Sequence, residues 1–251
     1  MNLLRSLLIV TLTVALFGLS AAAQSPVTSD TVLYLDFAGS QGEPIAALQD
    51  PVSGLTAVGV QVAPTSLVFG EPNPVTGKGS AYYDNPSTGN QNGSYLYIAD
   101  HPAIDFAGVR ALTFELFVRP ESAKLAVLLR KTQPGGEDGY LITLDAEGRV
   151  IFQLQSPYER KQIRTGPGAA PVGKWTHIAA TWDGRDMRIY IDGEERATGT
   201  FADVLDGTDG HLGIGALVRD VNRSSWGQIF HGSISQIRIS KAALFPEDFL
   251  K

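Results

Sequence analysis

Two Asp-Gly pairs close together in one apolar stretch constrain the fold of this chain more than any other feature of its sequence. The first pair, at positions 183–184, separates the β-prone runs 175–182 and 187–191, and the second pair, at 192–193, follows directly. An Asp-Gly pair between such runs is a strong hairpin signal, because glycine adopts the positive φ that tight turns require. The stretch therefore predicts an antiparallel hairpin.

Short β-prone segments separated by turn residues continue along most of the remaining chain. They predict further strands at 30–37, 79–84, 94–98, 111–120, 125–131, 139–145, 149–155, 194–200, 211–215 and 229–240. Either Leu112, Phe114 and Leu116 or the opposite set of their strand faces the core. Many short strands with almost no helical periodicity are typical of an antiparallel two-sheet β-sandwich, so the expected fold class is all-β.

Two stretches in the first half of the chain predict less regular connections. Residues 39–79 are rich in Gly, Pro and Ala, which predicts a long, weakly structured excursion with one short strand at 66–69. The polar loop 85–93 lies between the β-prone segments 79–84 and 94–98. We expect these two segments to pair with each other around that loop.

Three segments resemble the signature of laminin-G-like domains of the concanavalin A-like lectin/glucanase superfamily. The first is the strand that carries Trp175 and His177 ahead of an Asp-Gly turn, and the second passes through Tyr190 to the next Asp-Gly turn. The third is the closing strand 232–239, which carries three isoleucines. The resemblance extends over residues 32–250 and implies a concanavalin A-like jelly roll with a short C-terminal helical clasp.

The N-terminal residues 1–23 have the composition of a secretory signal peptide. Arg5 precedes the apolar run 7–19, and three alanines at 21–23 fit a cleavage site. We therefore expect a single mature domain at 24–251 in a secreted protein, either extracellular or periplasmic. No second apolar run of this kind follows in the sequence, which predicts that the chain does not insert into a membrane.

The composition limits which cellular compartments and which kinds of binding partner are expected for this chain. The chain has no cysteine, which excludes disulfides, zinc-thiolate sites and thiol nucleophiles and favours a bacterial exported protein. Its formal net charge of −6 disfavours nucleic acid, whose binding depends on basic patches. A glycan or an extracellular protein is therefore the expected partner.

Two clusters of polar and aromatic residues are the candidate ligand-binding sites. Trp226 lies close to Asn222 and Arg223 in the sequence, where an exposed indole can stack on a sugar and polar side chains can bind its hydroxyls. Tyr158 begins a second cluster with the basic residues of 160–164. The alternatives are a tryptophan folded back to cap the sandwich and a solvated run of charges.

Trp175 and His177 are interpreted as structural residues. They lie two residues apart on one face of a strand, and the resemblance implies that the tryptophan is part of the core. A strand histidine without nearby carboxylates is usually just hydrogen-bonded. Replacing Trp175 by Ala is then expected to cost about 3–5 kcal/mol of stability. Trp182, on the opposite face, is a further core candidate.

The resemblance also implies a possible calcium site, because many related domains hold Ca²⁺ with acidic side chains and loop carbonyls. The candidate ligands are Asp203, Asp206 and Asp209. However, the closing strand has Ser235 and Gln236 where many family members have acidic residues. Acids in glycine-rich loops also serve as turn formers. We therefore expect no required cofactor, with a structural Ca²⁺ as the one open possibility.

The sequence favours a binding module over an enzyme. The Glu-x-Asp-x-x-Glu run of sandwich glucanases is missing, and Glu115 alone does not provide the pair of carboxylates that glycoside hydrolysis requires. Jelly-roll polysaccharide lyases have a histidine at the position that Arg164 occupies here. We therefore expect a non-catalytic module that recognises carbohydrate or a cell-surface or matrix component. The main alternative is a structural or adhesion module, which predicts a large exposed apolar patch. The second is a polysaccharide hydrolase or lyase, which predicts carboxylates or a His-Tyr-Arg set within reach in a groove.

Overall fold

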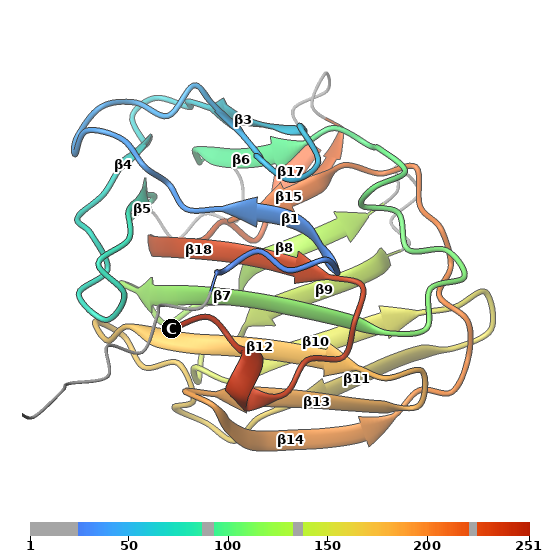
Figure 1. Cartoon of the computed structure of the whole chain (residues 1–251). Coiled ribbons are helices and arrows are strands. Elements are labelled where there is room, and N and C mark those ends of the chain that lie inside the picture. Colours follow the sequence, from blue (N-terminus) through green and yellow to red (C-terminus); the bar gives the residue numbers. More distant parts are fainter. Residues whose placement is uncertain (1–24, 87–92, 133–137, 221–224) are drawn as a thin grey trace, which may run out of the picture.

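Two antiparallel sheets packed face to face form most of the protein (Figure 1). The computed structural model describes residues 25–86, 93–132, 138–220 and 225–251. The predicted all-β, two-sheet sandwich is confirmed. Within the described ranges, no helix is long and apolar enough to cross a membrane.

Within these described ranges, each sheet has eight strands. Sheet A consists, in spatial order, of β14 (Glu194–Thr200), β13 (Asp186–Ile191), β12 (Thr176–Trp182), β7 (Leu112–Pro120), β18 (Gly232–Ser240), β5 (Ser80–Asp84) and β4 (Ser66–Phe69), with β1 (Thr31–Leu35) paired to β18 beside this path. Sheet B consists of β11 (Arg160–Arg164), β10 (Val150–Gln155), β9 (Asp138–Leu144), β8 (Ala126–Thr132), β15 (Leu212–Ile214), β6 (Tyr95–Ile98), β3 (Thr56–Val60) and β2 (Ala47–Gln49). A separate hairpin consists of β16 (Leu217–Asp220) and β17 (Ser225–Gly227).

Alternation along the strands turns one face of each sheet inward. On β7, Leu112, Phe114 and Leu116 are buried, so this set and not the opposite one faces the core. The same core cluster includes apolar side chains of both sheets. Trp182 is buried there as well, and its indole nitrogen donates a hydrogen bond to the carbonyl of Phe201 at 2.8 Å.

The expectation of a weakly structured excursion at 39–79 is wrong. Besides the expected β4, this stretch contains β2 and β3, which form one edge of sheet B. Backbone pairing with β6 holds β3 in place. Gly59 permits a close approach here, because a Cβ at this position would lie 1.8 Å from the carbonyl oxygen of Ile45. A glycine that suggested a loop therefore serves close packing at a sheet edge.

The expected pairing of 79–84 with 94–98 is also wrong. β5 pairs with β4 and β18 in sheet A, whereas β6 pairs with β3 and β15 in sheet B. The chain therefore crosses from one sheet to the other between these strands. The Asn85 side chain fixes the crossing, because its amide nitrogen donates to the carbonyls of Ser94 and Phe230 at 2.9 and 2.8 Å. These tertiary contacts override the local hairpin pattern.

A C-terminal tail covers one end of the outer face of sheet A, and it is the predicted clasp. Its helical part is the short 3₁₀ helix η1 (Pro246–Asp248), after which Phe249 and Leu250 are buried. The ring of Phe249 packs on His177 and Tyr190, with centroid distances of 5.7 and 5.2 Å. We call this part of the outer face the clasped end.

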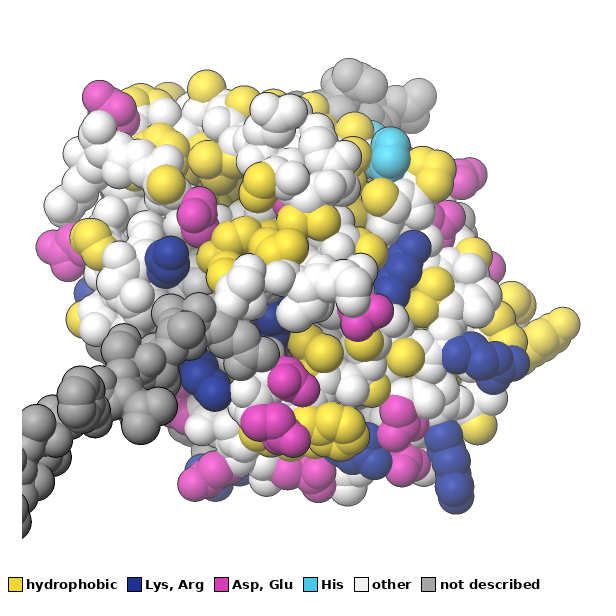
Figure 2. Space-filling model, viewed as in Figure 1, with side chains coloured by type: hydrophobic (Ala, Val, Ile, Leu, Met, Phe, Trp, Pro, Cys, Tyr) yellow, Lys and Arg dark blue, Asp and Glu magenta, His cyan; other side chains and the backbone are white. Residues whose placement is uncertain are grey.

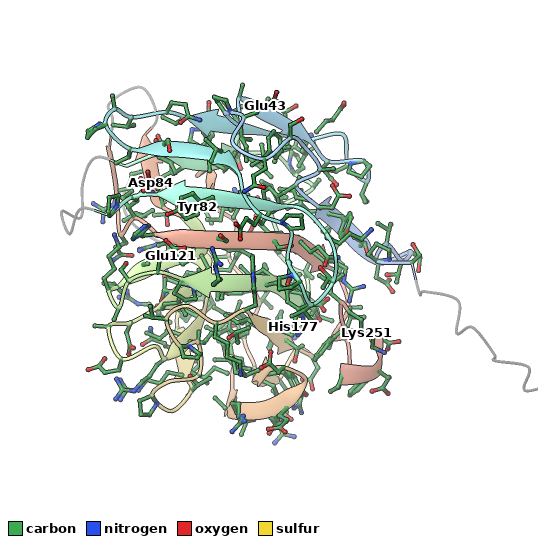
Figure 3. All side chains as sticks on the ribbon, turned by 90° about the vertical axis from the view of Figure 1, so that its left-hand side faces the viewer. Glu43, Tyr82, Asp84, Glu121, His177 and Lys251 are labelled. Carbon is green, nitrogen blue, oxygen red and sulfur yellow. The ribbon has the colours of Figure 1, made fainter. Side chains whose placement is uncertain are left out.

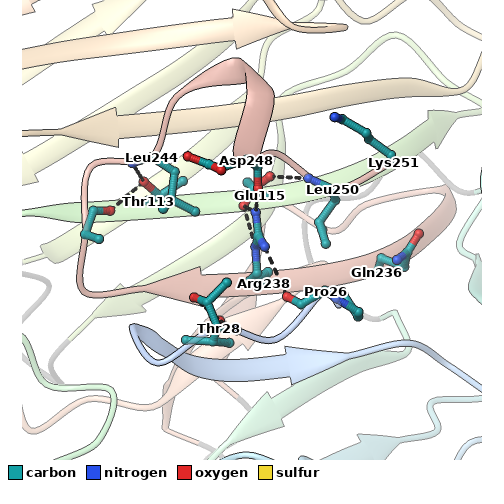
Figure 4. Close-up of polar contacts among 12 residues, drawn as sticks. Pro26, Thr28, Thr113, Glu115, Gln236, Arg238, Leu244, Asp248, Leu250 and Lys251 are labelled. Carbon is teal, nitrogen blue, oxygen red and sulfur yellow. Dashed lines mark hydrogen bonds and ion pairs between the residues drawn. The ribbon is translucent and has the colours of Figure 1, made fainter. Parts of the chain in front are cut away.

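A buried ion pair fastens both ends of the described chain to the clasped end (Figure 4). Glu115 on β7 accepts a hydrogen bond from Arg238 Nε on β18 at 2.6 Å, and both side chains are buried. The same carboxylate accepts a hydrogen bond from the Leu250 backbone nitrogen at 2.8 Å. The guanidinium donates to the carbonyls of Pro26 and Asp248 at 3.1 and 2.6 Å. The first and last described segments therefore depend on one pair.

His177 and Trp175 lie near the clasped end on the outer side of sheet A. His177 Nε2 is 3.5 Å from the Glu115 carboxylate and has no hydrogen-bond partner among the described residues. The expectation of a histidine without nearby carboxylates is therefore wrong. Trp175 is half-buried against a small cluster that includes Phe117 and Leu250. Because it is only half-buried, we expect Trp175→Ala to cost the lower end of the predicted range, about 3 kcal/mol.

Candidate functional site

Cross-strand register places four outward-facing residues in one row on sheet A. From β7 through β18 and β5 to β4, the successive partners are Arg119, Ser233, Tyr82 and Val68. Cross-strand partners share a face of the sheet, so their side chains are neighbours. The row crosses β7 at Arg119, near the end of the strand, whereas Glu115 lies near its middle.

A hollow of about 410 Å³ lies over this row, on the face that Figure 3 turns to the viewer. We call it the outer hollow. Its described lining residues are Gln41, Gly42, Val68, Phe69, Gly70, Glu71, Tyr82, Arg119, Glu121 and Ser233. The volume falls within the range of about 300–1,000 Å³ that is usual for small-ligand sites.

Glu121 is the centre of a polar network in the outer hollow. Its carboxylate accepts hydrogen bonds from the Tyr82 hydroxyl at 2.9 Å and from Arg119 Nη2 at 3.1 Å. His231 Nε2 lies 3.5 Å from the same carboxylate. The guanidinium of Arg119 also lies over the Trp175 ring, 5.9 Å from its centroid. These contacts hold the polar groups of the hollow in fixed positions before any ligand arrives.

Burial determines the protonation states of the two titratable rings in this network. Burial raises the pKa of Tyr82 to about 12, and the hydrogen bond to Glu121 acts in the same direction. Burial also lowers the pKa of His231 below its usual value, against the opposing effect of the Glu121 charge. At neutral pH both rings are therefore uncharged.

The outer hollow combines apolar surface with hydrogen-bonding groups. The rings of Tyr82 and Phe69 supply the apolar surface, and Arg119, Glu121 and Ser233 supply donors and acceptors. A few fixed polar groups in a concave site orient a ligand and give specificity. This arrangement can hold the C–H side of a sugar against a ring while its hydroxyls pair with the polar groups.

Sequence reasoning missed the outer hollow, although one signal pointed to it. Arg119 and Glu121 continue the outward-facing positions of β7, opposite its buried apolar set. Two charged residues in alternation at the end of a strand could have marked this face. Tyr82 and Ser233 belong to strands that are distant in the sequence, and only the sheet register brings them together.

The structure does not bring Tyr158 to the outer hollow. Tyr158 is 90% exposed in the turn between β10 and β11 of sheet B. Trp226 lies in β17, where its backbone pairs with Val218. Asn222 and Arg223, the other two predicted ligand-binding residues, lie outside the described residues. The predicted site at 222–226 therefore stays a prediction.

The predicted calcium ligands lie in the segment between β14 and β15. Asp203 accepts hydrogen bonds from the Ser156 hydroxyl at 2.6 Å and from the Val204 backbone nitrogen at 2.8 Å, and these bonds lower its pKa. Asp206 is half-buried and Asp209 is exposed. In the part of the chain that the structure describes, no group of three or more acidic or histidine side chains is arranged to hold a metal ion. Calcium binding stays a prediction from the resemblance.

Solved structures with the same sandwich fold share little sequence with this chain. The binding domain of Paraclostridial Mosquitocidal Protein 1 has a TM-score of 0.61 at 14% identity, covering 87% of this chain and 50% of that one. Domain 4 of AbnA, a GH43 extracellular arabinanase from Geobacillus stearothermophilus, was solved with arabinotriose. Its TM-score is 0.60 at 19% identity, covering 87% of this chain and 96% of that one.

A third similar structure is the binding domain of Botulinum Neurotoxin DC in complex with SialylT. Its TM-score is 0.58 at 15% identity, covering 88% of this chain and 50% of that one. This chain therefore spans about half the length of the two toxin binding domains. At these identities the likeness establishes the shared fold alone.

A family model agrees with the fold and with the resemblance in the sequence. It describes the Concanavalin A-like lectin/glucanases superfamily and matches residues 90–248, more than half of the chain. The matched range includes the hairpin of β12 and β13 and the closing strand β18. The chain belongs to the Concanavalin A-like lectin/glucanases superfamily.

Proposed function

We propose that this protein is a non-catalytic carbohydrate-binding module and that the outer hollow is its glycan site. The observation that carries the proposal is the cross-strand row under the hollow. It places the ring of Tyr82 beside the hydroxyl of Ser233 and the paired Arg119 and Glu121. Aromatic surface next to fixed polar groups is the composition that sugar recognition requires.

Two of the similar structures support the ligand class. The AbnA domain was solved with arabinotriose, and the Botulinum Neurotoxin DC domain with SialylT. Function resides in a site and not in a fold, so these complexes support a glycan ligand by analogy and say nothing about where it binds here. The predicted signal peptide at 1–23 fits this role, because an exported module would meet glycans outside the cell.

The main alternative, an adhesion module for protein partners, has less support. The large hydrophobic side chains that are exposed among the described residues come from separate segments: Val75, Leu125, Tyr158, Val172 and Phe245. Figure 2 shows one face of the molecule, on which hydrophobic side chains gather in the upper middle and charged side chains lie mostly below and towards the edges. The most exposed large hydrophobic side chains still come from separate segments, whereas protein interfaces usually have a contiguous apolar centre.

One observation favours a second candidate function, cleavage of a polysaccharide. Tyr82 and Arg119 of the outer hollow contact Glu121, and so does His231, which does not line the hollow; a His-Tyr-Arg set is the kind that proton abstraction from a sugar would use. Two features weigh against it. Tyr82, with a pKa raised to about 12, is a poor base at neutral pH. Arg119 shares its charge with Glu121, which weakens any stabilisation of a substrate charge.

The test is binding of the purified protein to a broad glycan and polysaccharide array. We expect Tyr82→Ala to weaken binding at least about tenfold, which corresponds to the loss of about 1.4 kcal/mol of ligand contacts. Tyr158→Ala is the matched control, because it removes a tyrosine from the other sheet, and it should leave binding unchanged. The opposite result would favour the site predicted from the sequence, and Trp226→Ala would then be the next variant.

Two further measurements on the same samples test the remaining expectations. Release of reducing sugar or unsaturated product from the array polysaccharides would support the enzyme instead of the binding module. Arrays run with calcium and with a chelator test the calcium site. Binding that depends on calcium and is lost in Asp203→Ala would support a metal in the loop between β14 and β15. A blank array in both buffers would overturn the proposed function.

A further inference from the structure

We infer that the outer hollow selects uncharged sugars over acidic ones, and that Glu121 makes this selection. The inference rests on the proposed function, because it names the class of glycan that the same site would take. It follows from the charges along the lining, from the contacts of Arg119, and from the acidic side chains on the surrounding face.

Carboxylates outnumber cations along the described lining of the hollow. Glu71 and Glu121 are its acidic members and Arg119 is its basic member. Glu71 is exposed and Glu121 is partly buried. Charges interact more strongly near a protein surface than in bulk water, so an incoming carboxylate meets repulsion there. Such repulsion is how a site rejects a ligand that otherwise fits.

Arg119 offsets this repulsion only in part, because it shares its charge with Glu121. Its Nη2 already donates to Glu121 at 3.1 Å, while its Nε is buried without a hydrogen-bond partner among the described residues. The Trp175 ring holds the guanidinium from another side, at 5.9 Å. A ligand carboxylate that pairs with the remaining N–H groups would share the guanidinium with Glu121. Two carboxylates close to one guanidinium repel each other, and this loss would offset the new contact.

Uncharged hydroxyls fit the same groups without that loss. A sugar hydroxyl both donates and accepts, so it can donate to the Glu121 carboxylate or accept from the Ser233 hydroxyl. The Tyr82 oxygen donates its hydrogen to Glu121 and keeps lone pairs that can accept another one. Neighbouring hydroxyls of one sugar can therefore pair with neighbouring groups of the hollow, and no additional charge is desolvated.

The surrounding face acts in the same direction. Figure 3 shows Glu43, Asp84 and Glu121 on the same face as Tyr82. Lys124 supplies an opposing positive charge near His231, and its Nζ donates to the carbonyl of Asn85 at 3.2 Å. The Asp84 charge is close enough to act on Tyr82, so at physiological salt, where surface charges act over about 8 Å, it reinforces the repulsion at the hollow.

The experiment compares neutral glycans with acidic partners of closely related structure. The panel pairs xylan with glucuronoxylan, mannan with polymannuronate, lactose with sialyllactose, and carboxyl-reduced polygalacturonate with polygalacturonate. We expect at least one neutral member to bind the full chain at least about tenfold more tightly than its acidic partner. In Glu121→Gln this ratio should fall below about threefold, because a neutral side chain of the same shape removes the repulsion. In the wild-type protein the ratio should also fall with added salt.

Glu194→Gln is the matched control, because Glu194 is an exposed residue of β14 that pairs with Arg196 at 2.7 Å and does not line the hollow. It should leave both affinities unchanged. Thermal unfolding of each variant confirms that it is folded.

Three outcomes would overturn the inference, and they differ in whether the proposed function and the proposed site remain supported. Acidic members that bind as tightly as neutral ones would remove the selectivity but keep the carbohydrate-binding module. Binding to neutral members that is unchanged in both Tyr82→Ala and Glu121→Gln would place the glycan away from the outer hollow. No binding to any member of the panel or of the broad array would remove the proposed function and this inference together.

Discussion

Two places on the outer face of sheet A carry an arginine–glutamate pair anchored on β7, but the two pairs differ in what covers them. At the clasped end, Arg238 pairs with Glu115, and their side chains are 2% and 0% exposed. At the outer hollow, Arg119 pairs with Glu121, and their side chains are 28% and 30% exposed. The C-terminal tail lies over the first pair, whereas the second pair lines an open hollow.

The difference shows that the degree of burial determines the role of otherwise similar ion pairs. Breaking a buried pair is strongly destabilising, because one charge is left in a dry environment without its partner. An exposed pair contributes little to stability, because water and salt screen it and can replace either partner. The clasped end is therefore suited to holding the chain ends, and the outer hollow is suited to exchanging its water for a ligand.

The largest expected effect is the loss of the buried pair. We expect Glu115→Ala to lower the free energy of unfolding by about 3–5 kcal/mol. The variant leaves the Arg238 guanidinium without its buried carboxylate and the Leu250 backbone nitrogen without its acceptor. Urea unfolding followed by fluorescence measures the change. A loss below about 1 kcal/mol, the range of exposed pairs, would contradict the buried role of this pair.

A double variant sharpens this prediction. Glu115→Leu combined with Arg238→Met replaces both charges by apolar side chains, and we expect it to be more stable than Glu115→Ala, because no unpaired charge is left. The backbone carbonyls of Pro26 and Asp248 lose their donor in this variant, so some destabilisation should remain. A double variant that is less stable than Glu115→Ala would mean that these carbonyl contacts matter more than the charge pair.

The second expected effect is smaller and lies at the outer hollow. Glu121→Ala should change the free energy of unfolding by no more than about 1 kcal/mol, since the pair with Arg119 is partly exposed. Its effect on glycan binding should be larger than its effect on stability. Parallel urea unfolding and array binding make the comparison. A loss of stability as large as that of Glu115→Ala would show that the outer hollow is structural.

Local sequence patterns predicted most of the fold where neighbouring strands pair with each other. The Asp-Gly turn at 183–184 joins β12 and β13, and the meander of β8, β9 and β10 follows the expected strands. The crossing at Asn85 and the edge strand around Gly59 were not predicted. Both depend on contacts with distant segments, and local hydrophobic patterns carry no information about such contacts.

The candidate site was harder to predict than the fold, for the same physical reason. Tyr82 is separated from Arg119 by the whole of β6 and from Ser233 by most of the chain, and only the register of β5, β18 and β7 joins them. An aromatic residue in a polar turn, such as Tyr158, is easily recognised in a sequence as an exposed side chain. A half-buried tyrosine within a strand cannot be distinguished there from a core residue. A site built on a sheet face is therefore less visible in the sequence than one built on a loop.

The smallest expected effect is a pH dependence from His231 beside the outer hollow. Burial lowers the pKa of His231, and the charge of Lys124 acts in the same direction, while Glu121 and Asp84 oppose the shift. The unfolded chain takes up this proton near pH 6.5, whereas the folded protein takes it up only at a lower pH. The free energy of unfolding should therefore decrease as the pH falls through about 6.5, until the folded pKa is reached.

Comparing the wild-type protein with His231→Gln isolates this effect from the other histidines. Urea unfolding between pH 7.5 and about 5 covers the window above the usual carboxylate pKa values. The wild-type protein should lose more stability than the variant across this window, because only the wild-type protein has the His231 imidazole, whose pKa is lowered by burial. If the wild-type protein instead gains stability relative to the variant, the Glu121 carboxylate outweighs burial. The Glu121 carboxylate would then stabilise the protonated imidazole of His231. The same carboxylate is proposed to accept a hydrogen bond from a sugar hydroxyl.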